Sequence, residues 1–300
     1  MTLHLVTGAT GFVGARLAEH LAGEGQDVRV AVRDPARLPD APWVSAVDVA
    51  RADVGDPDTL RTALTDVDVA YYLVHAMSDG DDYAARDREL ATTFAEACAE
   101  AGVRRIVYLG GLGAEGDDLT EHLRSRREVG RVFLDSPVPT VELRAGMVVG
   151  RGSASFDLLE QAIRRLPLLV GPSWLNRSMQ PIALPDLLFY LQAVAALPDD
   201  VNRALDVGGP DVVRYRDLLT AHARAGGRRA PATFTVPVLL PHTFSFLVGE
   251  LTRGPSSLNA ALVRSLSVDM VCTEHDIAEL IGDPPGGLTP LETALRMSRA

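Results

Sequence analysis

The chain has 300 residues, 47% of them apolar and 23% charged, which is enough for a sizeable buried core. Its formal net charge of −11 gives an acidic surface, which disfavours binding to nucleic acid and to anionic lipid. The basic residues are all arginine, so no reaction step can use a lysine as a Schiff base or proton relay.

The cysteines and the apolar stretches of the sequence indicate in which cellular compartment the protein works. Neither Cys98 nor Cys272 has metal-ligand spacing around it, so we expect reduced thiols, no metal site and a cytoplasmic protein. The longest apolar stretches are too short to cross a membrane, and we expect no signal peptide ahead of the first strand. These observations predict a protein without nucleic-acid or membrane partners.

A strand, a glycine loop and a helix open the chain. Residues 3–6 read as a short buried strand, residues 7–14 follow as Thr-Gly-Ala-Thr-Gly-Phe-Val-Gly, and a helical pattern begins at Ala15. In this order the N–H groups at the helix N-terminus can meet a pyrophosphate, while the glycines allow a tight turn and close approach of the backbone. The sequence therefore predicts dinucleotide binding, with a purely structural glycine turn as the alternative.

Strand and helix patterns alternate from there to about residue 150. The strands are predicted over 28–32, 44–49, 67–74, 104–109 and 140–149, and the helices over 56–64, 83–101 and 119–134. This alternation predicts an α/β fold, a doubly wound parallel sheet with helices on both faces, over residues 1–150.

The pattern changes after Gly150, where segments become shorter and prolines more frequent. Helices are predicted over 156–166, 186–197 and 215–225, with an edge strand over 204–207. Residues 231–251 mix prolines with large apolar residues, which indicates either an apolar wall over a substrate or a contact between copies in a homodimer. We expect residues 151–300 to form a smaller α+β region that covers a substrate.

Several motifs lie at the predicted strand ends. They are Thr7-Gly-x-x-Gly-x-x-Gly14, Asp53-Val54, Tyr-Tyr-Leu-Val-His over 71–75, Tyr-Leu-Gly-Gly over 108–111, His-Leu-x-Ser-Arg-x-Glu-Val-Gly over 122–130, Leu-Arg-Ala-Gly over 143–146, Gln-Pro-Ile over 180–182 with Asp186, and Asp-Val-Gly-Gly-Pro over 206–210. With these motifs the chain resembles the extended or atypical branch of the short-chain dehydrogenase/reductase superfamily. More narrowly, it is similar to bacterial NmrA-like NAD(P)H-binding proteins.

The resemblance implies a Rossmann-like fold whose cofactor crosses the C-terminal edge of the sheet. It implies a set of cofactor-binding residues: Gly8, Thr10, Gly11, Phe12, Val13 and Gly14 at the pyrophosphate, Asp53 and Val54 at the adenine, Leu73, Val74 and His75 at the adenine and ribose side, and Ala145, Gly146 and Met147 at the nicotinamide. For His75 we favour a buried, hydrogen-bonded histidine at a strand end over a catalytic one.

The end of the second strand decides between the two nicotinamide cofactors. A carboxylate there binds the ribose 2′-OH of NAD, whereas an arginine accommodates the 2′-phosphate of NADP. Arg33 and Asp34 both follow the strand, and in the family register Val32 takes the acidic position with Arg33 next. Because a guanidinium suits a phosphate bidentately, we predict NADP, with NAD as the alternative.

The usual catalytic residues of the superfamily are replaced in this chain. Gly110 and Gly111 stand in the region of its serine, and His122 and Arg126 stand where its tyrosine and lysine would lie, on one helix face. The pair predicts His122 as a proton donor, with Arg126 holding the ribose and disfavouring protonation of His122. The alternative is a pair that only anchors the cofactor.

Together these features predict an NADP-dependent oxidoreductase that moves a hydride between the nicotinamide and a small apolar carbonyl, quinone or enone. One alternative is an NmrA-like sensor that binds the cofactor without turnover and regulates a protein partner. A second is an epimerase or dehydratase with tightly bound NAD.

Overall fold

The computed structural model of the chain describes residues 2–74, 83–113, 120–165, 168–230, 232–236 and 268–299. Of the predicted site residues, His75 alone lies outside these ranges. The stretch 231–251 is described only at Ala232–Val236.

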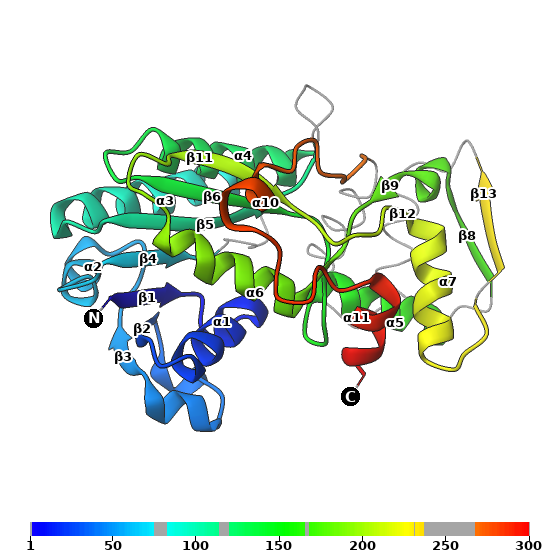
Figure 1. Ribbon diagram of the computed structural model, residues 1–300, viewed down its shortest axis with the longest axis horizontal. Coiled ribbons are helices and arrows are strands. Elements are labelled where there is room, and N and C mark those ends of the chain that lie inside the picture. The colour runs from blue at the N-terminus through cyan, green and yellow to red at the C-terminus, as the bar shows by residue number, and fades with distance from the viewer. Residues whose placement is uncertain are drawn as a thin grey trace.

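A parallel sheet with strand order β11-β6-β5-β4-β1-β2-β3 forms the centre of the molecule (Figure 1). Its seven strands are β1 (Leu3–Thr7), β2 (Asp27–Val32), β3 (Asp48–Arg51), β4 (Val69–Tyr72), β5 (Arg105–Gly111), β6 (Thr140–Ala145) and β11 (Arg203–Val207). Strands β2 and β3 lie on one side of β1, and the next strand in the chain, β4, pairs with the other side of β1. The strand order therefore reverses between β1 and β4. Such a reversal opens a crevice at the carboxyl ends of the strands. The predicted doubly wound α/β fold is confirmed.

Helices cover both faces of this sheet. One face packs against α1 (Phe12–Gly23) and α6 (Leu184–Ala193), and the other against α2 (Pro57–Ala63), α3 (Tyr83–Ala101) and α4 (Glu121–Leu134). Side chains of β4 alternate between the two apolar cores, Tyr71 toward the first and Tyr72 toward the second. Because both faces are buried, the strand reads in the sequence as a continuous apolar run.

A second region lies beyond the carboxyl ends of the strands, at the right of Figure 1. Its core joins α5 (Ala154–Arg165), α7 (Tyr215–Ala225) and α11 (Leu291–Met297). Three two-stranded sheets surround that core: β7 (Val148–Val149) with β10 (Ile182–Ala183), β9 (Ser178–Met179) with β12 (Val213–Arg214), and β8 (Leu168–Pro172) with β13 (Ala232–Val236). Although α6 and β11 follow residue 150, both pack on the central sheet.

Two predicted strands are wrong in part. The stretch 44–49 begins as the 3₁₀ turn η2 (Pro42–Ala46), which buries Trp43 in the first core, and the strand starts only at Asp48. The stretch 140–149 is two strands, because the chain bends at Gly146 and Met147 to pair β7 with β10. The remaining short elements are η1 (Pro35–Arg37), η3 (Ser173–Asn176), η4 (Val194–Ala196) and α10 (Asp276–Ile281).

The described residues offer neither a membrane span nor a metal site. Among their helices, none combines the length and apolar character that a membrane span requires. Nor do their histidine, cysteine, aspartate and glutamate side chains form a group of three able to hold a metal ion.

Candidate active site

The glycine loop between β1 and α1 has no room for side chains. Gly8 has a φ of +70°, and a Cβ there would lie 2.5 Å from the carbonyl oxygen of Leu73. A Cβ on Gly14 would lie 2.3 Å from the carbonyl oxygen of Gly8, so the loop packs directly on the first turn of α1. Within the described chain no side chain caps this helix, whose N-cap is Gly11. Its first N–H groups therefore fit an anionic ligand such as a pyrophosphate.

Thr7 fastens the two strands that border the crevice. Its hydroxyl donates a hydrogen bond to the carbonyl oxygen of Tyr71 at 2.9 Å and accepts one from the N–H of Leu73 at 3.1 Å. This side chain thus fixes the end of β4 against the end of β1, where Leu73 and Val74 are half-buried. Sequence reasoning gave Thr7 no role of its own, although a threonine directly before the glycine loop was the available signal.

The other residues of the loop differ in their surroundings. Thr10 is exposed, and Val13 is half-buried against the first core. The ring of Phe12 lies against Gly150, where a Cβ would be 2.6 Å from the ring, and also against Gly152. Phe12 therefore connects the loop with the segment between β7 and α5.

The end of β2 places a cation and a carboxylate side by side. The carboxylate of Asp34 accepts a hydrogen bond from the N–H of Ala36 at 3.1 Å and so caps η1. Arg33 is exposed and makes no hydrogen bond or ion pair with any residue that the structure describes. Both side chains are exposed, and Asp34 is the one tied to a neighbouring turn.

Asp53 and Val54 lie in the turn before α2. The Asp53 carboxylate accepts a hydrogen bond from the N–H of Gly55 at 2.9 Å, and the backbone N–H of Asp53 donates to the Thr59 hydroxyl at 3.1 Å. Val54 packs against the second core. Arg86 of α3 approaches the same turn, 3.4 Å from where a Cβ on Gly55 would lie. Sequence reasoning missed this arginine, because its position next to the turn depends on how α3 packs.

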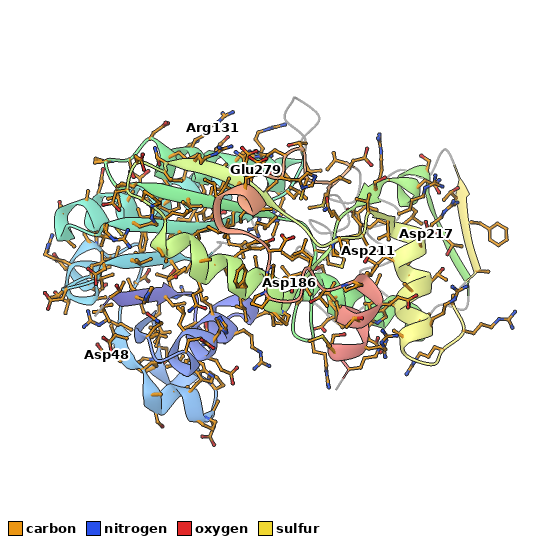
Figure 2. The ribbon with its side chains drawn as sticks, in the orientation of Figure 1. Asp48, Arg131, Asp186, Asp211, Asp217 and Glu279 are labelled. Atoms are coloured by element: carbon orange, nitrogen blue, oxygen red, sulfur yellow. The ribbon has the colours of Figure 1, made fainter. Side chains whose placement is uncertain are left out.

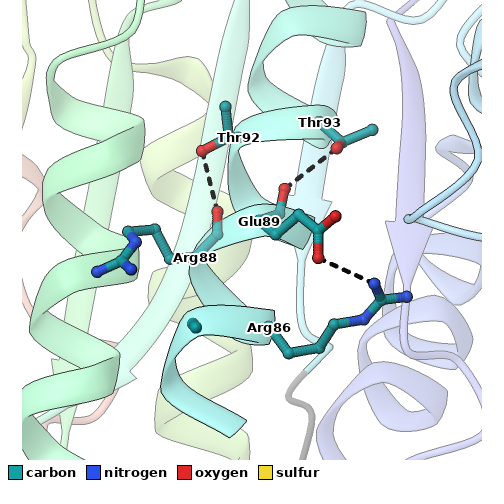
Figure 3. Close-up of a pocket in the computed structure, with 6 residues that line it drawn as sticks. Arg86, Arg88, Glu89, Thr92 and Thr93 are labelled. Carbon is teal, nitrogen blue, oxygen red and sulfur yellow. Dashed lines mark hydrogen bonds and ion pairs between the residues drawn. The ribbon is translucent and has the colours of Figure 1, made fainter. Parts of the chain in front are cut away.

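A hollow of about 680 Å³ opens on the outer face of α3 (Figure 3). It is lined by Ala85, Arg86, Arg88, Glu89, Thr92 and Thr93. Its charged and hydroxyl groups already have partners, such as the Arg86–Glu89 ion pair at 2.9 Å and the hydrogen bond from Thr92 to the carbonyl of Arg88. None of the predicted site residues lines it, so we place the candidate site at the strand ends instead.

The end of β5 lies against the side chains of Leu123 and Arg126. A Cβ on Gly111 would lie 3.0 Å from Leu123 Cδ2 and 3.2 Å from Arg126 Cδ. Thr120 caps α4 by accepting a hydrogen bond from the N–H of Leu123 at 3.4 Å. The first turns of α4 therefore lie directly over the carboxyl end of this strand.

His122 and Arg126 contact each other as the i, i+4 spacing predicts. Nε of Arg126 donates a hydrogen bond to Nε2 of His122 at 3.1 Å, and both side chains are half-buried. Since a guanidinium can only donate, the imidazole accepts at Nε2 and carries its proton on Nδ1. The contact therefore favours neutral His122.

The nearest tyrosine on β5 does not take the superfamily's acid–base role. Tyr108 donates a hydrogen bond from its hydroxyl to the carbonyl oxygen of Arg126 at 3.2 Å. Burial raises the pKa of Tyr108 far above its ordinary value, so the phenol stays neutral and supports α4 structurally.

The bend after β6 lies beside the end of β5. Ala145 is in register with Gly111, and its carbonyl oxygen accepts a hydrogen bond from the N–H of Leu112 at 2.9 Å. A Cβ on Gly146 would lie 3.1 Å from the carbonyl oxygen of Gln180, and Met147 accepts from the N–H of Ile182 at 3.0 Å. The residues predicted at the nicotinamide thus neighbour the strand over which Arg126 lies.

The donor set at these strand ends fits a dinucleotide. A bare glycine loop and an uncapped helix lie at β1, an available arginine at β2, and the paired imidazole and guanidinium of His122 and Arg126 at β5. The predicted roles of the individual residues remain predictions.

Comparisons with known proteins support a nicotinamide dinucleotide as the cofactor. The family described as NAD(P)H-binding matches residues 8–136. The chain is 35% identical over 228 residues to the (4-alkanoyl-5-oxo-2,5-dihydrofuran-3-yl)methyl phosphate reductase of Streptomyces griseus, which covers 75% of this chain and 74% of that protein.

Solved structures share the whole fold at low sequence identity. The NADPH-dependent quinone oxidoreductase of Escherichia coli, crystallised with NADPH, superposes with a TM-score of 0.78 at 18% identity and covers 100% of both chains. A nucleoside-diphosphate-sugar epimerase of Staphylococcus aureus gives a TM-score of 0.77 at 18% identity, over 99% of this chain and 100% of that one.

Proposed function

The chain belongs to the atypical short-chain dehydrogenase/reductase superfamily and has an NAD(P)H-binding domain, and from that premise we propose that it is an NADPH-dependent reductase of small apolar enones. Carbonyl compounds and quinones are the related acceptor classes. The observation that carries the proposal is the His122–Arg126 contact over the end of β5.

In such a reaction the chain's own residues stabilise the negative charge that develops on the carbonyl oxygen. When bound, the reduced cofactor would supply a hydride to the β-carbon of the enone, the electron pair of the double bond would move toward the carbonyl oxygen, and a proton from water would then add to the α-carbon to complete the reduction. His122, neutral and protonated on Nδ1, donates a hydrogen bond to that oxygen as it gains charge. Arg126 holds the imidazole in this tautomer by donating to Nε2.

NADPH is favoured over NADH by the residues at the end of β2. The carboxylate of Asp34 uses one oxygen to cap η1, which leaves it one oxygen for a ribose 2′-OH. Arg33 is exposed beside it and suits a 2′-phosphate.

The choice of an enone rests on the reductase from S. griseus. Its name specifies an unsaturated oxo-dihydrofuran ring that carries an alkanoyl group and a methyl phosphate, and in this ring a carbon–carbon double bond is conjugated to a carbonyl. We extend the conjugated double bond, without the phosphate, to this chain as a class of acceptor.

A sensor without turnover is the second candidate. Glycines 110 and 111 and the His122–Arg126 pair replace the serine, tyrosine and lysine of the superfamily, and this loss favours it. Such a protein would bind the reduced cofactor and use its occupancy to regulate a partner.

One experiment separates the candidates. The purified protein is titrated with NADPH and NADH, and absorbance at the nicotinamide band is followed with a panel of enones, quinones and ketones. A reductase binds NADPH more tightly than NADH and oxidises it with at least one enone. Tight binding without oxidation across the panel favours the sensor, whereas tightly held NAD that does not exchange favours an epimerase or dehydratase.

His122→Phe tests the donor directly. Because a positioned hydrogen-bond donor to a developing oxyanion contributes about 10²–10³-fold to a rate, turnover falls by about a hundredfold or more while NADPH affinity is retained. The matched control is His275→Gln, which alters an exposed histidine in the C-terminal part of the chain. Turnover unchanged in His122→Phe contradicts the proposed role.

A further inference from the structure

A buried carboxylate lies between the sheet and α4. Glu142 of β6 is 1% exposed, and a Cβ on Gly110 of β5 would lie 2.5 Å from its Oε1. On the opposite side, a Cβ on Gly130 of α4 would lie 2.6 Å from its Oε2. The Glu142 carboxylate therefore fills the space that two glycines leave between a strand and a helix.

Arginines compensate its charge incompletely. Nε of Arg144 lies 3.2 Å from Oε2, and Arg127 of α4 also acts on the carboxylate electrostatically. Neither carboxylate oxygen makes a hydrogen bond with a residue that the structure describes. Burial raises the pKa of Glu142, whereas the two arginines oppose that rise. A carboxyl group in such a place is costly to bury.

The spacing of α4 connects this carboxylate to the candidate site. His122, Arg126 and Gly130 are four residues apart and share one face of the helix. At one end of that face Gly130 rests on Glu142, and in the middle the stem of Arg126 rests on Gly111. Arg127 also donates a hydrogen bond to the carbonyl oxygen of Gly113, which fixes the segment after β5.

The geometry points to Glu142 as a positioning residue, whose carboxylate sets the height of α4 above the sheet and thereby the place of His122 and Arg126. This inference rests on the proposed reductase function. It adds a residue that touches neither the cofactor loop nor the pair and acts through the backbone of Gly130.

Gly130→Ala and Glu142→Ala test the inference from both sides. The methyl group of the first pushes α4 away from the carboxylate, and the second removes the group on which α4 rests. Because a misplacement of about 1 Å can cost about a hundredfold in rate, we expect turnover to fall by about tenfold or more in each. NADPH affinity stays within about twofold, since the glycine loop is untouched.

The double variant Gly130→Ala/Glu142→Ala decides whether the two act through shared space. The methyl group enters the space that the carboxylate leaves, so turnover returns to within about threefold of the original protein. Losses that simply add overturn the inference. Arg131→Ala, on the exposed face of the same helix, is the control and leaves turnover unchanged.

Two further measurements keep the test decisive. Glu142→Gln preserves the shape without the charge, and we expect turnover within about threefold of the original protein; a loss as large as in Glu142→Ala overturns the spatial account. If no acceptor is reduced at all, the proposed function fails, and amide exchange of α4 replaces turnover as the readout. The positioning role is supported if amide exchange in α4 is faster in Gly130→Ala and slows to the original rate in the double variant. Unchanged exchange in Gly130→Ala overturns it.

Discussion

The central sheet and the C-terminal segment, residues 268–299, are held in place in different ways. Around the sheet, apolar side chains fill two cores, and the glycine loop works by having no side chains. The C-terminal segment is bound through its backbone by carboxylates of α6, of β11 and of the loop after β11. That segment runs from α10 beside β11, past α6, to α11 (Figure 1).

The polar contacts of the C-terminal segment recur along its length. The Asp186 carboxylate accepts hydrogen bonds from the N–H and the hydroxyl of Thr289, both at 2.8 Å, and Asp206 does the same with Thr273. Asp211 accepts from the N–H of Leu291 at 2.7 Å. Figure 2 labels Asp186 and Asp211 beside this segment. Motifs in which sequence reasoning saw only a family likeness thus fasten the C-terminal segment.

The comparison teaches that the two regions tolerate opposite changes. Around the glycine loop, adding one methyl group is harmful because backbone atoms already fill the space. Along the C-terminal segment, removing one carboxylate is harmful because partly buried N–H groups lose their acceptors.

Gly14→Ala should have the largest effect. Its Cβ would lie 2.3 Å from the Gly8 carbonyl, and such overpacking costs about 3 kcal/mol, which corresponds to about a hundredfold weaker NADPH binding if the loop absorbs it. Fluorescence titration measures the affinity. Gly23→Ala, in the same helix with nothing within 4 Å of its Cβ, is the matched control and should bind normally. An unchanged NADPH affinity in Gly14→Ala would show that the loop can shift to make room for the methyl group.

Asp186→Ala should have the next largest effect, on stability. It leaves the half-buried N–H and hydroxyl of Thr289 without their acceptor, which costs about 2 kcal/mol of the free energy of unfolding. Denaturant titration measures this loss. Asp217→Ala, also in the first turn of a helix but exposed, should change stability by less than about 0.5 kcal/mol. Equal losses in both variants would point to helix dipoles rather than to the contact with Thr289.

Arg33→Ala should shift cofactor preference. Losing a charged contact to the 2′-phosphate costs about 1.5 kcal/mol, so NADPH binding weakens about tenfold while NADH binding stays the same. Arg37→Ala, in the adjacent 3₁₀ turn, is the control. If Arg33→Ala weakens both cofactors equally, the guanidinium does not read the phosphate.

A pH titration of stability should show the smallest effect, on the first core. Burial lowers the pKa of His4 below its ordinary value of 6.5. At pH values just below 6.5, His4 is therefore protonated in the unfolded chain but stays neutral in the folded protein. Stability therefore falls as the pH drops through 6.5 and is fully present above it. Melting temperatures of the original protein and His4→Gln should converge as the pH falls from 7 to 5. A constant difference would exclude His4 as the source.

Local patterns in the sequence predicted much of the fold. The helices at 83–101 and 215–225 have the predicted bounds, because apolar periodicity and a following glycine mark such helices directly. The contact between His122 and Arg126 was equally accessible, since a spacing of four residues on a helix brings side chains together without any tertiary information.

Long-range partners could not be predicted in this way. Thr7 acts on residues more than sixty positions away, and Asp186 acts on Thr289 across more than a hundred. The pairing of β8 with β13 and the addition of β11 to the central sheet likewise join segments that no short window contains.

The sequence alone determined the nucleotide-binding half, since its glycine loop, alternating strands and helix faces depend on neighbours in the chain. Only the tertiary structure decided how Glu142 fits between two glycines and how the C-terminal segment is fastened. Those features arise when distant segments share one buried volume, and their hydrogen bonds and excluded space exist only after the chain has packed.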